Sequence, residues 1–147
     1  MLEVPIRRVD GGPDPLDLPS RMRPGDAAAD LPSRVDVVIG AGRRELVPTG
    51  FAAAIPTGAC GLILPRSGLA LEWGVTVLNA PGLIDSGYRG ELQVILFNTS
   101  PEAVSITRGQ RIAQLLVLAV EALRFVECDE LPPAPDDRGS SGFGSSG

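Results

Sequence analysis

Residues Gly82–Glu91 read GLIDSGYRGE and lie between two strand-like runs, Val75–Asn79 and Leu92–Phe97. Glycine lets the backbone come close to a ligand because no Cβ stands in the way. An aspartate on a tight turn beside an aromatic ring, here Asp85 and Tyr88, can present a base to a bound molecule. The competing interpretation is a β-turn aspartate that bonds its own backbone.

Outward from this stretch, short apolar runs alternate with turn signals rich in Gly, Pro and Asn. Many short strands with such punctuation predict an all-β sandwich or barrel. One helical turn is expected at Ser67–Trp73, with Ser67 as its cap. The expected further strands are Val4–Arg7 at an edge, Val35–Ile39, Glu45–Ile55, Gly61–Leu64, Val104–Thr107, Arg111–Val120 and Leu123–Val126.

The chain of 147 residues predicts one domain, followed by a segment of different composition. We expect a β domain over residues 1–130 and a flexible arm over residues 131–147. Leu131–Asp137 is a stiff, proline-rich spacer, and Arg138–Gly147 is mostly glycine and serine, which cannot bury enough surface to fold alone. The arm is either a disordered end or a lid that orders over an anionic, aromatic ligand, because it carries Arg138 and Phe143.

Composition excludes several classes of function. Thirteen basic against 18 acidic residues, a net charge of −5, argues against generic nucleic-acid binding. The absence of histidine excludes His-based triads and the usual zinc sites. Cys60 and Cys128 are expected to be small buried apolar residues, with a disulfide left open. With no export signal and no apolar run near ~18 residues, the sequence predicts a cytoplasmic protein without a membrane span.

Two further segments carry polar groups of a kind that binds phosphate. In Pro65–Ala70, Arg66 can fork onto phosphate oxygens, while Ser67 and Gly68 can form a small anion nest; a structural turn with a surface arginine explains these residues equally well. In Arg108–Leu115, Gln114 stands in an otherwise apolar run, so it is either part of a core hydrogen-bond network, which we favour, or a ligand contact. Arg111 is expected to be structural.

A third polar segment places Asp26 and Asp30 four residues apart. Such a pair usually marks a solvated loop face. A carboxylate can also hold waters around Mg²⁺, which keeps part of its hydration shell and borrows phosphate oxygens.

The order of these segments resembles the five motifs of the trimeric dUTPase family. The matching segments are Asp26–Leu31, Pro65–Ala70, Gly82–Glu91, Arg108–Leu115 and Arg138–Gly147. The resemblance implies a jelly-roll-like β-clip subunit in a homotrimer, with active sites shared between subunits and closed by the C-terminal arm. It implies hydrolysis of dUTP to dUMP and pyrophosphate with Mg²⁺ on the triphosphate, which limits uracil in DNA and supplies dUMP for dTMP synthesis.

The resemblance also implies a role for individual residues. Asp85 would position and activate the attacking water, and Tyr88 would pack under the deoxyribose and exclude a 2′-hydroxyl. Asp30 would hold Mg²⁺ through water. The remaining substrate contacts would be phosphate binding by Arg66, Ser67, Gly68, Gln114 and Arg138, reading of the uracil edge by the Asn79–Ile84 hairpin with Asn79, Gly82 and Ile84, stacking by Phe143, and wrapping of the phosphates by the tail with Gly144 and Ser145.

Two alternatives stay open at this point. A dCTP deaminase shares the fold and a Pro-Arg-Ser-type phosphate segment, although its chemistry needs a glutamate base by resemblance. A catalytically silent trimer that binds nucleotides or partner proteins is the other. Ala28 stands where the first motif commonly has glycine, and this departure from the family pattern lies beside Asp30 and not beside Asp85.

Overall fold

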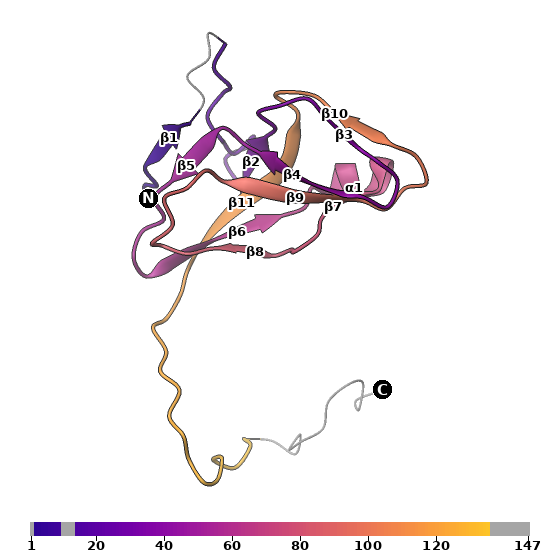
Figure 1. The fold of residues 1–147 in the computed structure, drawn as a ribbon. Helices are drawn as coiled ribbons and strands as arrows, with labels where there is room; N and C mark the ends of the chain where they lie inside the picture. The colour runs from indigo at the N-terminus through magenta and orange to yellow at the C-terminus, as the bar shows by residue number, and fades with distance from the viewer. Residues whose placement is uncertain (1, 10–13, 136–147) are drawn as a thin grey trace.

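Short strands make up nearly all of the regular secondary structure (Figure 1). The computed structural model describes residues 2–9 and 14–135. In chain order the elements are β1 Ile6–Arg8, β2 Ala29–Pro32, β3 Val37–Ile39, β4 Arg44–Pro48, β5 Phe51–Ala53, β6 Ala59–Leu64, α1 Ser67–Trp73, β7 Val75–Val77, β8 Gly82–Ile84, β9 Gln93–Asn98, β10 Val104–Ile106 and β11 Arg111–Ala119. The all-β prediction is confirmed.

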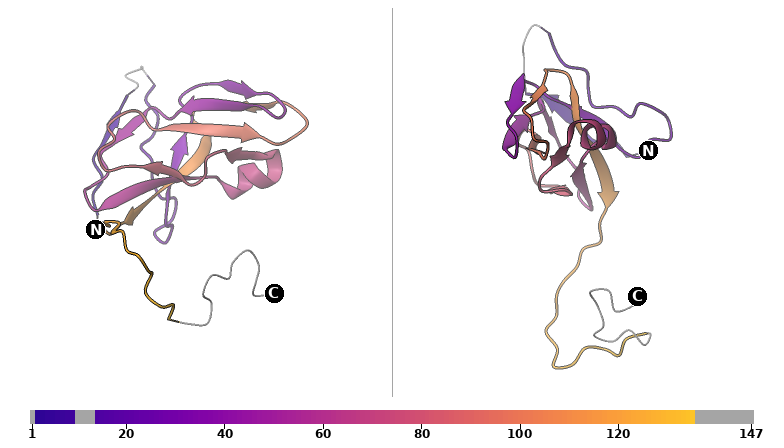
Figure 2. Two further views of the ribbon diagram at one scale, coloured as in Figure 1. Left: turned by 60° about the horizontal axis from the view of Figure 1, so that its bottom comes forward. Right: turned by 90° about the vertical axis from the view of Figure 1, so that its right-hand side faces the viewer.

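Two sheets face each other across the core (Figures 1 and 2). One has the order β2-β11-β6-β8 and the other the order β4-β9-β7, while β1 pairs with β5 and β10 with β3. All of these pairings are antiparallel. The inward side chains of both sheets belong to one hydrophobic cluster, as expected for a sandwich.

Strand β9 shows how the sequence selects the inward face. Its side chains alternate, so Val94, Leu96 and Asn98 are buried. Asn98 is polar but fully buried, and its amide nitrogen donates to the carbonyls of Ile39 and Glu102 at 2.9 and 2.7 Å. These bonds satisfy the side chain and join β9 to the β3 and β10 ends of the fold.

Helix α1 forms where one turn was expected, but its start differs from the prediction. Arg66, in extended backbone conformation, is the N-cap, and Ser67 is the first helical residue without a side-chain cap bond. Gly74 ends the helix with φ of 66°, and its N–H donates to the Leu69 carbonyl. Glycine adopts this left-handed conformation without a Cβ penalty, so it stops the helix after two turns.

The structure corrects the strand assignment in three places. The run Glu45–Ile55 is split into β4 and β5 by a turn at Thr49 and Gly50, where Gly50 has φ of +84°. Strand β2 was missed because Ala29 and Asp30 at its start do not form an apolar run. Leu123–Val126 is not a strand: its side chains are exposed, and the chain leaves the two sheets after β11 as an extended segment (Figures 1 and 2).

The cysteines divide between core and surface. Cys60 on β6 is buried, as expected, whereas Cys128 is exposed in the extended segment, so the burial prediction was wrong for Cys128. Both thiols are free. In the described part of the chain, no helix has the length and apolar character needed to cross a membrane.

Candidate active site

Asp30 on β2 lies at the centre of a cluster of guanidinium groups. Its Oδ1 is 3.0 Å from Arg66 Nε, and its Oδ2 is 3.1 Å from Arg111 Nη1. Arg66 also donates from Nη1 to the Arg111 carbonyl at 3.1 Å. Arg66 is therefore held in place rather than being a loose surface side chain, and the two arginines contact the same carboxylate.

Strand β11 brings this cluster together from three distant segments. It is the neighbour of both β2 and β6, and Gln114 stands opposite Asp30 on one side and Leu64 on the other. The pairing of β11 with β2 has a register irregularity between Arg111 and Ala113, and Arg111, at this irregularity, donates a hydrogen bond to Asp30. The first, second and fourth sequence motifs thus meet at adjoining strand ends.

Gln114 serves as a structural member of this cluster. Its Nε2 donates to the Pro65 carbonyl at 2.9 Å, which ties β11 to the segment that carries Arg66. The favoured network interpretation is confirmed by this bond. An amide nitrogen carries two N–H donors, so Gln114, which lines the pocket described next, has a second donor to offer a ligand oxygen.

A pocket of about 850 Å³ lies over this cluster. This volume falls in the range of small-molecule sites. Its lining combines guanidinium, carboxylate and amide groups from several segments, which are Met22, Arg23, Asp26, Ala27, Ala28, Asp30, Leu64, Arg66, Ser67, Arg111, Gln114 and Leu116. Ser67 and Gly68 are exposed in the first turn of α1, where helical N–H groups have no intrahelical partners. Such a pocket can bind a polyanion.

Asp85 and Tyr88 lie on an exposed turn after β8. The Tyr88 N–H donates to the Asp85 carbonyl at 3.1 Å, which closes a β-turn. Arg89 Nη1 donates to the carbonyls of Ser86 and Tyr88 at 2.6 and 2.7 Å, and the Tyr88 hydroxyl donates to the Glu91 carbonyl at 2.9 Å. The turn is thus held by its own residues, and its carboxylate and ring remain open to a ligand.

The segment before this turn connects two sheets and does not form the expected hairpin. Strand β7 pairs with β9, whereas β8 pairs with β6. Asn79 is exposed, Gly82 is buried and Ile84 is half-buried. A Cβ on Gly82 would lie 3.3 Å from the Asn79 amide nitrogen, closer than ordinary van der Waals contact, so glycine gives the Asn79 side chain room beside this backbone.

Within one chain, Asp85 and Arg66 lie beside opposite ends of β6: Arg66 follows its last residue, Leu64, and Asp85 follows the neighbouring strand β8 near Gly61. Strand β8 runs antiparallel to β6, with Ile84 opposite Gly61 and Gly82 opposite Ile63. The chain therefore travels away from Arg66 as it approaches Asp85. At about 3.3 Å per residue, the five residues from Gly61 to Arg66 correspond to roughly 16 Å. None of the residues Asn79, Gly82, Ile84, Asp85 and Tyr88 lines the pocket at Arg66.

The arm residues Arg138, Phe143, Gly144 and Ser145 lie outside the described residues. Their expected contacts with a ligand stay predictions.

Sequence reasoning expected Arg111 to be structural and did not single out the pair Arg34 and Glu91. Arg111 contacts Asp30, which fits a structural role, and it also lines the pocket. Arg34 and Glu91 form an ion pair at 3.3 Å. No local pattern signals this pair, because its members are far apart in sequence and meet only through the sheet pairing.

A divalent cation would find two carboxylates at this pocket, Asp26 and Asp30, beside the arginines. The described residues contain no cluster of three or more acidic, Cys or His side chains that could enclose a metal. Both Asp30 oxygens contact an arginine, but each has a second lone pair that can accept a hydrogen bond from water. This donor set suits Mg²⁺ held through its own waters and the substrate's phosphates.

Comparison with known proteins gives a consistent family. The dUTPase family model matches residues 14–147. The deoxyuridine 5′-triphosphate nucleotidohydrolase of Thermobifida fusca is 53% identical to this chain, and the match covers 99% of this chain and 79% of that protein. The same enzyme of Mycobacterium marinum is also 53% identical, and the match covers 97% of this chain and 93% of that protein. The structure of Staphylococcus bacteriophage 80alpha dUTPase with dUPNHPP shares the fold, with a TM-score of 0.90, 24% identity, and 100% and 99% coverage of the two chains. The chain belongs to the dUTPase family.

Proposed function

We propose that this chain hydrolyses dUTP to dUMP and pyrophosphate. The observation that carries the proposal is the cluster of Arg66, Arg111 and Gln114 around Asp30 at the pocket. Guanidinium groups bind phosphate through paired, planar hydrogen bonds, and a triphosphate is the kind of polyanion that such a cluster selects. In a cell this reaction would limit uracil in DNA and supply dUMP for dTMP synthesis.

Binding of the triphosphate falls to the pocket residues. Arg66 and the first-turn groups of Ser67 and Gly68 bind phosphate oxygens, while the amide of Gln114 contacts the α-phosphate. These contacts neutralise charge that builds on the phosphoryl oxygens as the water attacks. Because Asp30 pre-aligns Arg66, little reorganisation is needed when the substrate arrives.

Asp85 orients the attacking water and accepts its proton. A carboxylate is a weak base for bulk water, so its main contribution is to hold the water in line with the α-phosphorus. The barrier then falls mostly through positioning and through charge neutralisation by Arg66 and Arg138. Asn79, with the backbone at Gly82 and Ile84, reads the uracil edge.

The Tyr88 ring packs under the deoxyribose, where its bulk leaves no space for a ribose 2′-hydroxyl. Phe143 stacks on the uracil, and the tail around Gly144 and Ser145 wraps the phosphates. The extended segment after β11 supports this role because residues 120–135 leave the two sheets of their own chain (Figure 1).

Mg²⁺, when bound on the triphosphate, would neutralise phosphate charge and fix the conformation of the phosphate chain. Asp30 is the residue that would hold it, through water. Asp26 lies in the same pocket, but its Oδ2 already accepts from the Arg23 N–H at 2.9 Å.

The separation of Asp85 from Arg66 supports a homotrimer with shared sites. A carboxylate at one end of β6 and phosphate ligands at the other cannot serve one triphosphate within a single chain. In a closed three-fold assembly, the turn at Asp85 of one subunit can face the pocket at Arg66 of the next. The arm of a further subunit then covers the site.

Pyrophosphate release from dUTP, dCTP, dTTP and UTP tests the activity, with wild type and Asp85→Ala compared. We expect release from dUTP far above the other three nucleotides, and at least a hundredfold loss in Asp85→Ala with dUTP binding retained. An ammonia assay with dCTP is run in parallel. Ammonia release from dCTP, or dUTP binding without pyrophosphate release from wild type, would refute the proposal in favour of a deaminase or a silent binding trimer.

A further inference from the structure

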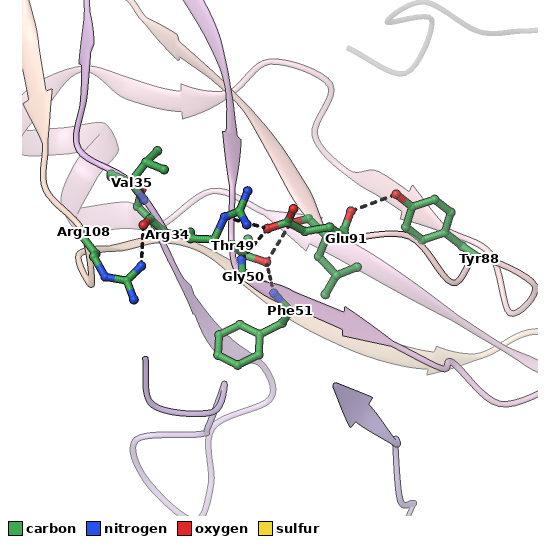
Figure 3. Close-up of polar contacts among 10 residues, drawn as sticks. Arg34, Val35, Thr49, Gly50, Phe51, Tyr88, Glu91 and Arg108 are labelled. Atoms are coloured by element: carbon green, nitrogen blue, oxygen red, sulfur yellow. Dashed lines mark hydrogen bonds and ion pairs between the residues drawn. The ribbon is translucent and has the colours of Figure 1, made fainter. Parts of the chain in front are cut away.

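The side chain of Glu91 is anchored to the turn between β4 and β5 (Figure 3). Its Oε1 accepts a hydrogen bond from the Gly50 N–H at 2.8 Å and lies 3.3 Å from Arg34 Nε. The Glu91 side chain is only 14% exposed and that of Arg34 30% exposed. The bond from the Gly50 N–H to this carboxylate is a charge-assisted hydrogen bond, and the low exposure of Glu91 shields it from solvent, so it restricts the side chain.

The turn that receives Glu91 is itself fixed in the core. Thr49, labelled in Figure 3, is fully buried, and its hydroxyl donates to the Leu92 carbonyl at 2.7 Å. The Leu92 N–H donates to the Phe51 carbonyl at 2.7 Å. Arg34 is fixed as well, because its N–H donates to the Pro48 carbonyl and its carbonyl accepts from Arg108 Nη1. Glu91 is therefore attached to a rigid support.

The main chain of Glu91 contacts the candidate substrate-binding ring. Its carbonyl accepts the Tyr88 hydroxyl at 2.9 Å, so the orientation of the ring depends on where residue 91 lies (Figure 3). Tyr88 is 42% exposed, so surrounding packing fixes only part of its position. One residue thus joins the buried turn, through its carboxylate, to the exposed ring, through its carbonyl.

We infer that Glu91 is a positioning residue that sets the Tyr88 ring for rejection of ribonucleotides. The inference deepens the proposed function and depends on it for the substrate. The carboxylate fixes the peptide between Glu91 and Leu92 against the Gly50 N–H, and the carbonyl then fixes the phenol. A ring that can tilt leaves space for a 2′-hydroxyl, so loss of this anchor should impair selectivity more than it impairs binding of dUTP.

The test compares Glu91→Ala, Glu91→Gln and the control Glu45→Ala, which removes an exposed glutamate of β4. Tyr88 is the sole tyrosine, so incorporated fluorotyrosine gives one fluorine NMR signal from this ring. For Glu91→Ala we expect a shifted or broadened signal and a three- to tenfold lower ratio of kcat/KM for dUTP to that for UTP, as follows from one lost positioning hydrogen bond. Glu91→Gln can still accept from Gly50 and should restore most of the ratio.

A lower melting temperature in Glu91→Ala with an unchanged fluorine signal and an unchanged dUTP-to-UTP ratio would overturn the inference, since Glu91 would then only stabilise the fold. If Glu91→Ala fails to fold, Arg34→Met serves instead, because it removes the ion pair and keeps the Gly50 bond. A smaller change in the fluorine signal and in the dUTP-to-UTP ratio then supports the inference. No change in either measurement refutes it. If wild type does not hydrolyse dUTP, the proposed function fails, while the fluorine signal still decides whether Glu91 controls the ring.

Discussion

Tyr88 lies directly against the backbone of Gly90. A Cβ placed on Gly90 would be 2.4 Å from the Tyr88 hydroxyl oxygen and 2.6 Å from the ring carbon that bears it. Real side chains do not tolerate such contacts, so only glycine at position 90 permits the observed ring position. By contrast, a Cβ on Gly87 in the same turn would meet nothing within 4 Å.

Gly90→Ala should displace the Tyr88 ring and break its bond to the Glu91 carbonyl. We expect kcat/KM for dUTP to fall about tenfold or more, because a misplaced binding group costs transition-state alignment. Gly87→Ala is the matched control and should stay close to wild type. Steady-state kinetics with a thermal melt of each variant provides the measurement, and equal kinetics in the two variants would contradict the assigned position of the ring.

Mixing two inactive variants tests whether sites are shared between subunits. Asp85→Ala and Arg66→Ala should each be inactive as purified proteins. After unfolding and refolding together in equal amounts, random three-fold assembly gives about a quarter of the sites an intact Asp85 and an intact Arg66 from different chains. Pyrophosphate release near that fraction is expected. A mixture as inactive as its components would mean that both groups come from one chain.

Asp30→Asn should raise the Mg²⁺ concentration needed for half-maximal activity about tenfold, because a neutral amide holds metal-bound water more weakly. Stability should change by no more than about 1 kcal/mol, since Arg66 and Arg111 are 27% and 46% exposed and solvent screens both pairs. Magnesium titrations are compared with those of Asp26→Asn. A larger shift in Asp26→Asn than in Asp30→Asn would show that Asp26, and not Asp30, holds the metal.

Two substitutions of Gln114 separate its structural contact from its contact with phosphate. Gln114→Leu removes the donor to the Pro65 carbonyl and should cost about 1–3 kcal/mol of stability if that carbonyl stays dry. Gln114→Glu loses the same donor and adds a negative charge to the pocket. We therefore expect similar unfolding curves for the two variants but a higher KM for dUTP in Gln114→Glu. Identical KM values would argue against phosphate contact at this position.

Arg138→Ala should lower kcat/KM for dUTP about ten- to a hundredfold, through loss of one charge-assisted contact to the γ-phosphate. The melting temperature should stay unchanged. Arg124→Ala removes an exposed arginine of the extended segment and is the matched control. Kinetics of Arg138→Ala that match those of Arg124→Ala would remove Arg138 from the site.

Much of this protein could be predicted from local pattern. Alternation and turn residues predicted strands β6, β9 and β11 to within a residue or two. Strand β2 escaped because Ala29 and Asp30 give no apolar signal, and its identity comes from pairing with β11. Leu123–Val126 was wrong for the opposite reason: an apolar run becomes a strand only if a partner is available, and in the described chain these residues lie beyond the two sheets.

The sequence by itself determined the fold class, the family and the identity of the candidate groups, because side-chain periodicity and motif order are properties of the chain alone. Only the tertiary structure decided that Asp30 pairs with both Arg66 and Arg111, that Glu91 reaches Gly50, and that Asp85 and Arg66 lie beside opposite ends of β6. These relations depend on which strands pair and in which direction. Pairing is a long-range outcome of packing, so no local stretch of sequence encodes it.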